Sequence, residues 1–221
     1  HIMSNAYVIT IMDNPKSVAA AKRCIQSGIS QNIKIEHFKA VTPKDNIPKL
    51  LEENEIYNLT EFKADAGKWS RYDRVVAGFL SHFHCWKKCV ENNELTLIFE
   101  HDAVITGTFP SSMHFDKCIT IGKPSYGRYN TPTKFGVNSL THKAYFGGAH
   151  GYLISPSGAK ELIAMAKISP GPTDTFLNLD NFPWLQEYYP WIVEAKDNFT
   201  TIQNENGCQA KHNYNETYEI I

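Results

Sequence analysis

The sequence predicts an α/β protein with a mostly parallel central sheet flanked by helices, and two observations carry this prediction. The chain opens with strand-like residues 6–12, a helical stretch of about 16–27 and a second strand-like segment, 33–38. A strand–helix–strand unit of this kind favours parallel strands joined by a right-handed crossover. Further on, residues 95–99 are apolar without a polar break, which is typical of a strand buried on both faces of a parallel sheet.

The other elements follow from periodicity and helix caps. Gly28 is expected to end the first helix. Residues 43–70 show no strong period, whereas 74–91 predict an amphipathic helix with one broad apolar face. Two more strands are expected, at 118–121 and 144–154.

The last clear element begins at Ser155-Pro156, a good cap and first residue for a helix. After residue 172 the chain is aromatic-rich and irregular. No repeat or linker is evident, so a single domain is expected over residues 3–221. His1 and Ile2, which precede Met3, are interpreted as a remnant of expression.

Composition limits the class of protein. The 221 residues are 42% hydrophobic and 20% charged, with a formal net charge of −1. This near-neutral balance gives the whole protein no general attraction to nucleic acid or anionic membranes. There is no long apolar stretch and no export signal, and the five cysteines are odd in number and widely spaced. We therefore expect reduced thiols and a cytoplasmic protein.

An acidic motif, Glu-His-Asp at residues 100–102, directly follows the apolar strand at 95–99. Ligands of open α/β sheets bind beyond the carboxyl ends of strands. Alternate residues of an extended chain face the same side, so the side chains of Glu100 and Asp102 are expected to lie together. Two carboxylates suit Mg²⁺ or Mn²⁺ holding a diphosphate. The alternative is an ordinary solvent-exposed strand end.

A basic segment, residues 117–143, contains five lysines and arginines interleaved with aromatic residues and no acid. It is either a solvated loop or a binding site for an anionic acceptor, since cations neutralise phosphates and aromatic rings stack on sugars or bases. Such an acceptor would be a phosphorylated glycan or a hydroxymethylated base flipped out of DNA.

Three potential metal ligands, His82, Cys85 and Cys89, share one face of the predicted helix 74–91. A zinc site would need a fourth ligand with recognisable spacing, and none is present. These residues are therefore interpreted as part of a half-polar core, that is, as buried residues that pack among both polar and apolar side chains.

Several short sequence motifs, taken in their order along the chain, resemble those of glycosyltransferase family 25, the lipopolysaccharide-type and collagen-type galactosyltransferases. They are Phe-Lys-Ala-Val at 38–41, Phe-Leu-Ser-His at 79–82 followed by Trp86, Glu-His-Asp at 100–102, Gly-Ala-His-Gly-Tyr-Leu-Ile-Ser at 148–155, Val193-Glu194 and Thr201-Ile202. The resemblance implies a GT-A-type nucleotide-diphospho-sugar transferase fold, a UDP-linked or other nucleotide-sugar donor, Mn²⁺ or Mg²⁺, and inversion at the anomeric carbon.

The chain departs from the family pattern in three places. Asp-Asn-Pro-Lys at 13–16 replaces an arginine-bearing turn, Arg74-Val75 replaces Gly-Glu, and His101 replaces the middle aspartate of the acidic motif. Because the flanking acids are kept, metal binding is still expected. His101 is interpreted equally well as a packed or hydrogen-bonding residue.

The resemblance also implies roles for individual residues. Asp102 and Glu100 are expected to bind the metal. Asp174 is the first candidate for the general base and Glu194 and Asp180 are the next, with an N-cap as the alternative role of Asp174. The expected donor contacts are Asp13, Ser81, His82, Gly148 and His150, although packing would explain the last four as well. Arg128 and Lys134 are expected to contact the acceptor or a phosphate.

The function expected from these residues is a metal-dependent, inverting hexosyl- or pentosyltransferase acting on a glycan such as lipopolysaccharide. Two alternatives stay open: transfer to a hydroxymethylated base in DNA, and a non-catalytic protein that binds a glycan or nucleotide sugar. Nucleotidyl transfer on a similar scaffold is disfavoured because the chain has no glycine-rich phosphate loop.

Overall fold

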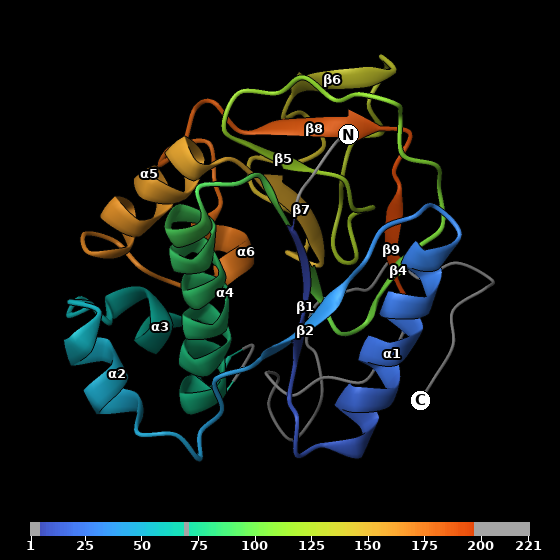
Figure 1. Cartoon of the computed structure of the whole chain (residues 1–221). Helices are drawn as coiled ribbons and strands as arrows, with labels where there is room; N and C mark the ends of the chain where they lie inside the picture. Colours follow the sequence, from blue (N-terminus) through green and yellow to red (C-terminus); the bar gives the residue numbers. More distant parts are fainter. Residues whose placement is uncertain (1–4, 69–70, 197–221) are drawn as a thin grey trace.

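The computed structural model describes residues 5–68 and 71–196, and within them seven strands form one mixed sheet (Figure 1). The strand order is β2-β1-β3-β7-β5-β8-β6. Their bounds are Glu36–Lys39, Asn5–Thr10, Thr96–Glu100, Gly151–Ile154, Cys118–Thr120, Gln186–Tyr189 and Gly136–Ser139. Only β7 and β6 run against the other strands of this sheet, which confirms the predicted α/β fold with a mostly parallel sheet.

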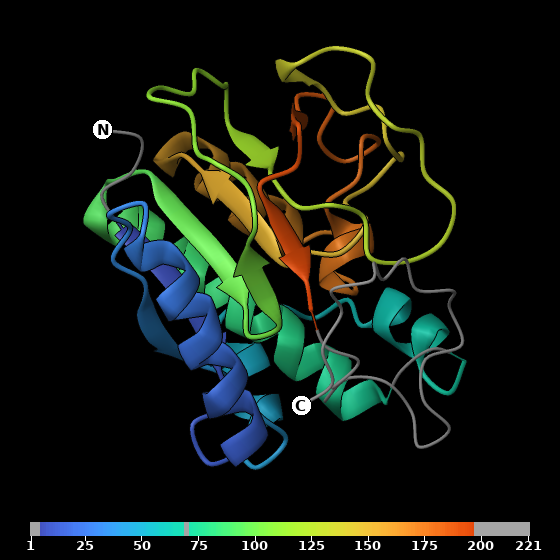
Figure 2. The ribbon, with the colours of Figure 1, turned by 90° about the vertical axis from the view of Figure 1, so that its right-hand side faces the viewer.

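Helices cover both faces of the sheet. Helix α1, Pro15–Ile29, lies on one face, and α4, Tyr72–Asn92, and α5, Pro156–Ala166, pack together on the other (Figures 1 and 2). Strand β3 separates two apolar clusters, with Leu97 and Phe99 in the α1 cluster and Ile98 in the α4 cluster. Burial on both faces is why residues 95–99 show no polar break.

Caps fix the ends of the helices, but the expected end of the first helix at Gly28 is wrong, because α1 continues to Ile29 and its C-cap is Ser30. The side chain of Asn14 accepts hydrogen bonds from the backbone of Lys16 and Ser17 at the start of α1, and Ser155 caps α5 through the amide of Gly158. Asn93 ends α4 in a left-handed conformation, with φ of 50°. The three predicted helices are therefore confirmed, each with slightly extended bounds.

Two strand predictions need correction. The strand expected at 144–154 is confined to β7, because Gly147 and Gly148 belong to an irregular segment in which Gly148 has φ of +114°. The strand expected at 33–38 begins only at Glu36.

Several short elements escaped the sequence analysis. Helices α2, α3 and α6 span Ile47–Glu53, Thr60–Asp65 and Thr173–Phe176. Strands β4 and β9, Ala103–Ile105 and Val193–Ala195, form a separate antiparallel pair, and β6 and β8 extend the main sheet. These segments are too short to show a period. The phrase Thr201-Ile202 and Cys208 lie outside the described residues.

Across 5–68 and 71–196, no helix combines the length and apolar character that crossing a membrane requires.

Candidate active site

Glu100 stands at the carboxyl end of β3 and faces α4. The amide of Glu100 bonds to the carbonyl of His150 at 3.2 Å, and its side chain lies 3.4 Å from His82 Nε2. The neighbouring parallel strands β1 and β2 end at the same edge of the sheet. Glu100 therefore occupies the edge at which α/β sheets bind ligands, as the sequence analysis predicts.

A chain of buried hydrogen bonds holds the His82 ring against Glu100. Trp86 Nε1 donates to the Tyr152 hydroxyl oxygen at 2.9 Å, and this hydroxyl lies 2.7 Å from His82 Nδ1. An indole N–H only donates and a carboxylate only accepts. The Tyr152 hydroxyl therefore donates to Nδ1, and His82 Nε2–H donates to Glu100.

This arrangement keeps Glu100 ionised. Burial alone raises the pKa of Glu100, but the hydrogen bond from His82, together with the electrostatic effect of the nearby His82, His150 and His101, outweighs it, so that the pKa lies below its ordinary value. The side chain is still 32% exposed. Glu100 thus presents a negative charge at the strand end that a ligand can reach.

His101 and Asp102 do not continue the strand. Strand β3 ends at Glu100 and residues 101–102 form a turn before β4, so the expectation that strand alternation places Glu100 and Asp102 on one side is wrong. His101 Nδ1 bonds to Ser17 Oγ of α1 at 2.8 Å, and burial lowers the pKa of His101. The carbonyl of Asp102 accepts from the amide of Lys196 at 2.9 Å.

Asp174, the first candidate for the general base, lies in α6, close enough to Glu100 for the charge of Glu100 to affect its pKa. Burial raises the pKa of Asp174 and the negative charge of Glu100 raises it further, while a hydrogen bond from the Tyr126 hydroxyl opposes both. Helix α6 is fixed by Phe176, which stacks on Trp86 with ring centroids 5.6 Å apart. Asp174 lies inside the first turn and the cap position is Pro172, so the N-cap alternative is wrong.

The other two candidates for the base differ in setting. Glu194 lies in β9 with its side chain 19% exposed and 3.8 Å from Lys123 Nζ. Asp180 is an exposed residue that follows α6.

Two of the expected donor contacts have other partners. The carboxylate of Asp13, exposed after β1, pairs with Lys44 Nζ at 2.7 Å. Ser81 is buried in α4, where its hydroxyl donates to the carbonyl of Ala77 and accepts from the amide of Val41. Ser81 thus fastens α4 to the chain that leaves β2, which is a structural role.

Glycines enclose His150 on two sides. A Cβ at Gly122 would lie 2.5 Å from His150 Nε2, and a Cβ at Gly148 would lie 2.7 Å from His150 Nδ1. The imidazole is buried, which lowers the pKa of His150, and its Nε2 has no hydrogen-bond partner. Gly148 is thus required by the packing of His150.

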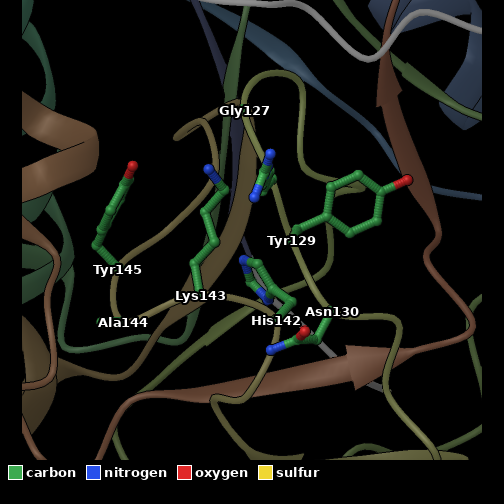
Figure 3. Close-up of a pocket in the computed structure, with 8 residues that line it drawn as sticks. Gly127, Tyr129, Asn130, His142, Lys143, Ala144 and Tyr145 are labelled. Atoms are coloured by element: carbon green, nitrogen blue, oxygen red, sulfur yellow. The ribbon is translucent and has the colours of Figure 1, made fainter.

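The basic segment borders a cavity of about 910 Å³ (Figure 3). Residues 127–130 and 142–145 line it, and Arg128 is among them. Lys134 is exposed and does not line this cavity. Figure 3 shows the side chains of Lys143 and Tyr145 on one side, Tyr129 on the other and His142 between them.

Two residues of this region, His142 and Glu187, escaped the sequence analysis. The mixture of basic and aromatic residues, Tyr126 among them, pointed to the segment that holds His142. Glu187 lies in β8, far along the chain, and no local pattern distinguishes it.

No zinc centre forms from the candidate ligands. Cys85 and Cys89 are buried free thiols, and His82 is engaged with Tyr152 and Glu100. Over the described ranges, no three His, Cys, Asp or Glu side chains are grouped so that they could enclose a metal ion. The interpretation of the three residues as half-polar core is consistent with this packing.

A mostly parallel sheet flanked by helices is consistent with a GT-A-like glycosyltransferase fold. The family model of glycosyltransferase family 25 (LPS biosynthesis protein) matches residues 3–124, more than half of the chain. This chain therefore belongs to glycosyltransferase family 25 and is a glycosyltransferase. No curated protein matches it.

Proposed function

We propose that this protein is a metal-dependent, inverting glycosyltransferase. It transfers a hexose or pentose from a nucleotide-sugar donor, UDP-linked, to a hydroxyl of a glycan such as lipopolysaccharide. The observation that carries the proposal is the ionised Glu100 at the carboxyl end of β3, beside Asp174, in a chain of this family. The family establishes sugar transfer, and these two acids supply the groups that the reaction needs.

Glu100 and Asp102 are proposed to hold Mg²⁺ or Mn²⁺. Both ions prefer oxygen ligands, and Mg²⁺ in nucleotide sites uses one or two carboxylates and takes its other ligands from phosphates and water. Glu100 ends β3 and Asp102 lies in the turn that follows it, so each would supply one carboxylate, and phosphate and water would supply the other ligands. When bound, the ion neutralises the charge of the departing nucleoside diphosphate.

Asp174 is proposed as the general base. In an inverting transfer, the base takes the proton of the acceptor hydroxyl as this oxygen attacks the anomeric carbon opposite the leaving diphosphate. A base works best when its pKa is close to the working pH, and burial raises the pKa of Asp174 in that direction. The hydroxyl of Tyr126 positions the carboxylate by donating to Oδ2.

The test is release of nucleotide from a panel of nucleotide sugars with Mn²⁺. Asp102→Asn is expected to lower the release rate by about 100-fold or more, because one negative metal ligand is lost. Asp116→Asn removes an equal charge at an exposed site before β5 and should leave the rate unchanged.

Three results would count against this proposal in different ways. If no donor is bound or hydrolysed and Asp102→Asn changes nothing, the enzyme proposal fails. Tight binding of a nucleotide sugar without turnover, even with acceptor glycans present, would indicate the non-catalytic alternative. Retention of the anomeric configuration in the product, read by NMR, would contradict inversion.

A further inference from the structure

We propose that the cavity lined by residues 127–130 and 142–145 binds the phosphate group of a phosphorylated sugar. Its position beside Asp174 makes this the acceptor side of the site, so the assignment to the acceptor rests on the proposed function. The cavity itself, its charge and its unpartnered histidine are independent of that function.

The charge of the cavity favours an anion. Arg128 and Lys143 line it, and no acidic residue does. Among the described residues, neither cation has a carboxylate within ion-pair distance. Lys143 Nζ instead lies over the rings of Tyr126 and Tyr145, 4.9 and 5.2 Å from their centroids. Two cations without acidic partners are suited to a phosphate group.

His142 supplies a second, independent observation. Its side chain is 1% exposed, and its Nε2 is buried with no hydrogen-bond partner in the described structure. Leaving a buried polar atom unpaired costs about 1–3 kcal/mol, so such an atom in a native fold calls for a partner. Because His142 lines the cavity, a ligand there is in a position to provide it.

Glu187 fixes the direction of this histidine. The Glu187 side chain is fully buried, and its Oε1 lies 2.8 Å from His142 Nδ1 and accepts the amides of Thr141 and His142 at 2.9 Å. Burial raises the pKa of Glu187, but these hydrogen bonds outweigh it and the pKa lies below its ordinary value. An ionised carboxylate only accepts, so His142 Nδ1 is the donor and Nε2 is left as an acceptor for a hydroxyl of the ligand.

The remaining walls suit a sugar. The ring of Tyr129 borders the cavity opposite Lys143 and Tyr145 (Figure 3), and Asn130 lines it as well. An aromatic face packs against the apolar side of a pyranose, and an amide pairs with its hydroxyls. A phosphate between the two cations, with a sugar hydroxyl donating to His142 Nε2 and the sugar ring against Tyr129, uses all the kinds of group that line the cavity.

The cavity adjoins the proposed base. Asp174 lies close enough to Lys143 for its charge to raise the pKa of that lysine, against the lowering by burial. Asp174 also bonds to Tyr126, over whose ring Lys143 lies. The Lys143 side of the cavity therefore leads to Asp174, and this is the side from which we expect a hydroxyl of the anchored sugar to reach the base.

The test is calorimetric titration of the full chain with mannose 6-phosphate, inorganic phosphate, mannose and UDP as separate probes. Mannose 6-phosphate is expected to bind at least 10-fold more tightly than mannose. Arg128→Gln and His142→Gln should each weaken its binding about 10-fold or more. The matched control is Lys22→Gln, which removes one charge from an exposed position on α1, across the molecule from the yellow loop in Figure 2, and should bind as the wild type does.

The outcomes are distinguishable. Equal affinity for mannose and mannose 6-phosphate, or unchanged binding in Arg128→Gln, overturns the cavity proposal even if His142→Gln fails to fold, because Arg128 is exposed. Phosphate bound as tightly as mannose 6-phosphate contradicts the role of Tyr129. Competition by UDP, together with loss of mannose 6-phosphate binding in Asp102→Asn, overturns the acceptor assignment and makes the cavity part of the donor site.

Failure of the proposed function gives a different pattern. If the protein turns over no nucleotide sugar but binds mannose 6-phosphate through Arg128 and His142, the cavity site stands without the transferase reaction. Turnover of a nucleotide sugar without any binding of mannose 6-phosphate leaves the transferase and removes the cavity proposal.

Discussion

The end of β3 and the cavity lined by residues 127–130 and 142–145 differ in charge and in how their polar groups are paired. At the strand end, Glu100, His82, Tyr152 and Trp86 form a continuous chain of hydrogen bonds around an ionised acid. The cavity carries two cations without acidic partners in the described structure and a histidine with an unpaired Nε2. The buried polar groups at the strand end are paired with one another, whereas the cations of the cavity and His142 Nε2 are free to pair with a ligand.

The two regions also differ in their relation to the family. Glu100, His82 and Trp86 lie inside the matched residues 3–124, whereas Tyr152, the cavity, Asp174 and β8 lie beyond them. Under the proposed function, the matched residues carry the acid that serves the donor, and the residues beyond them select the acceptor. The predictions below test this comparison.

The largest effect is expected at Asp174, which joins the two regions. Asp174→Asn should lower the rate of sugar transfer about 10²–10⁴-fold, because the acceptor hydroxyl loses its base. The measurement is kcat with a saturating nucleotide sugar. Glu194→Gln is the comparison variant, and a large loss there with Asp174→Asn still active would move the base to β9.

The buried pair of His142 and Glu187 in the cavity region should contribute to the free energy of unfolding. His142→Leu leaves the carboxylate of Glu187 buried without its histidine and is expected to cost about 3–5 kcal/mol in the free energy of unfolding. Urea denaturation measures it. The double variant with Glu187→Leu should recover part of the loss, and no recovery would show that the pair is not the cause.

The strand end should show a smaller loss. Tyr152→Phe leaves the buried N–H of Trp86 and Nδ1 of His82 without their partner, at a cost of about 1–3 kcal/mol. Tyr57→Phe is the matched control because Tyr57 is 68% exposed, and it should leave the urea midpoint unchanged. Equal effects of the two substitutions would contradict the hydrogen-bond chain.

The smallest effect is a gradual loss of stability in mild acid. Burial lowers the pKa of His101 and of His150, so the unfolded chain takes up protons at these residues before the folded chain does. Their contribution to stability is complete above the ordinary histidine pKa of about 6.5 and falls as the pH drops below it. Glu100, with a lowered pKa, adds a further loss only below the ordinary range of a glutamate.

Urea denaturation at pH 7.5, 6.5 and 5.5 measures this dependence. His101→Gln should flatten the decline between pH 6.5 and 5.5. A wild-type free energy of unfolding that does not change over this range would contradict it.

The parts of the fold that the sequence predicts are those with strong local signals. The apolar run at 95–99, the amphipathic pattern at 74–91 and the Ser155-Pro156 cap each reflect a requirement of their own element, and the structure confirms all three. Strands β6, β8 and β9 carry no such signal, because short strands are specified by the neighbours with which they pair.

For the site, the sequence by itself determined the family, the acidic strand end and a basic segment with aromatic residues. The tertiary structure alone decided that residues 101–102 turn away from the strand, that Asp174 lies beside Glu100, and that Glu187 aligns His142. The reason is physical: the pKa of a carboxylate and the direction of an imidazole depend on which groups surround them. His142 and Glu187 are 45 residues apart, and only the pairing of the loop after β6 with β8 brings them together.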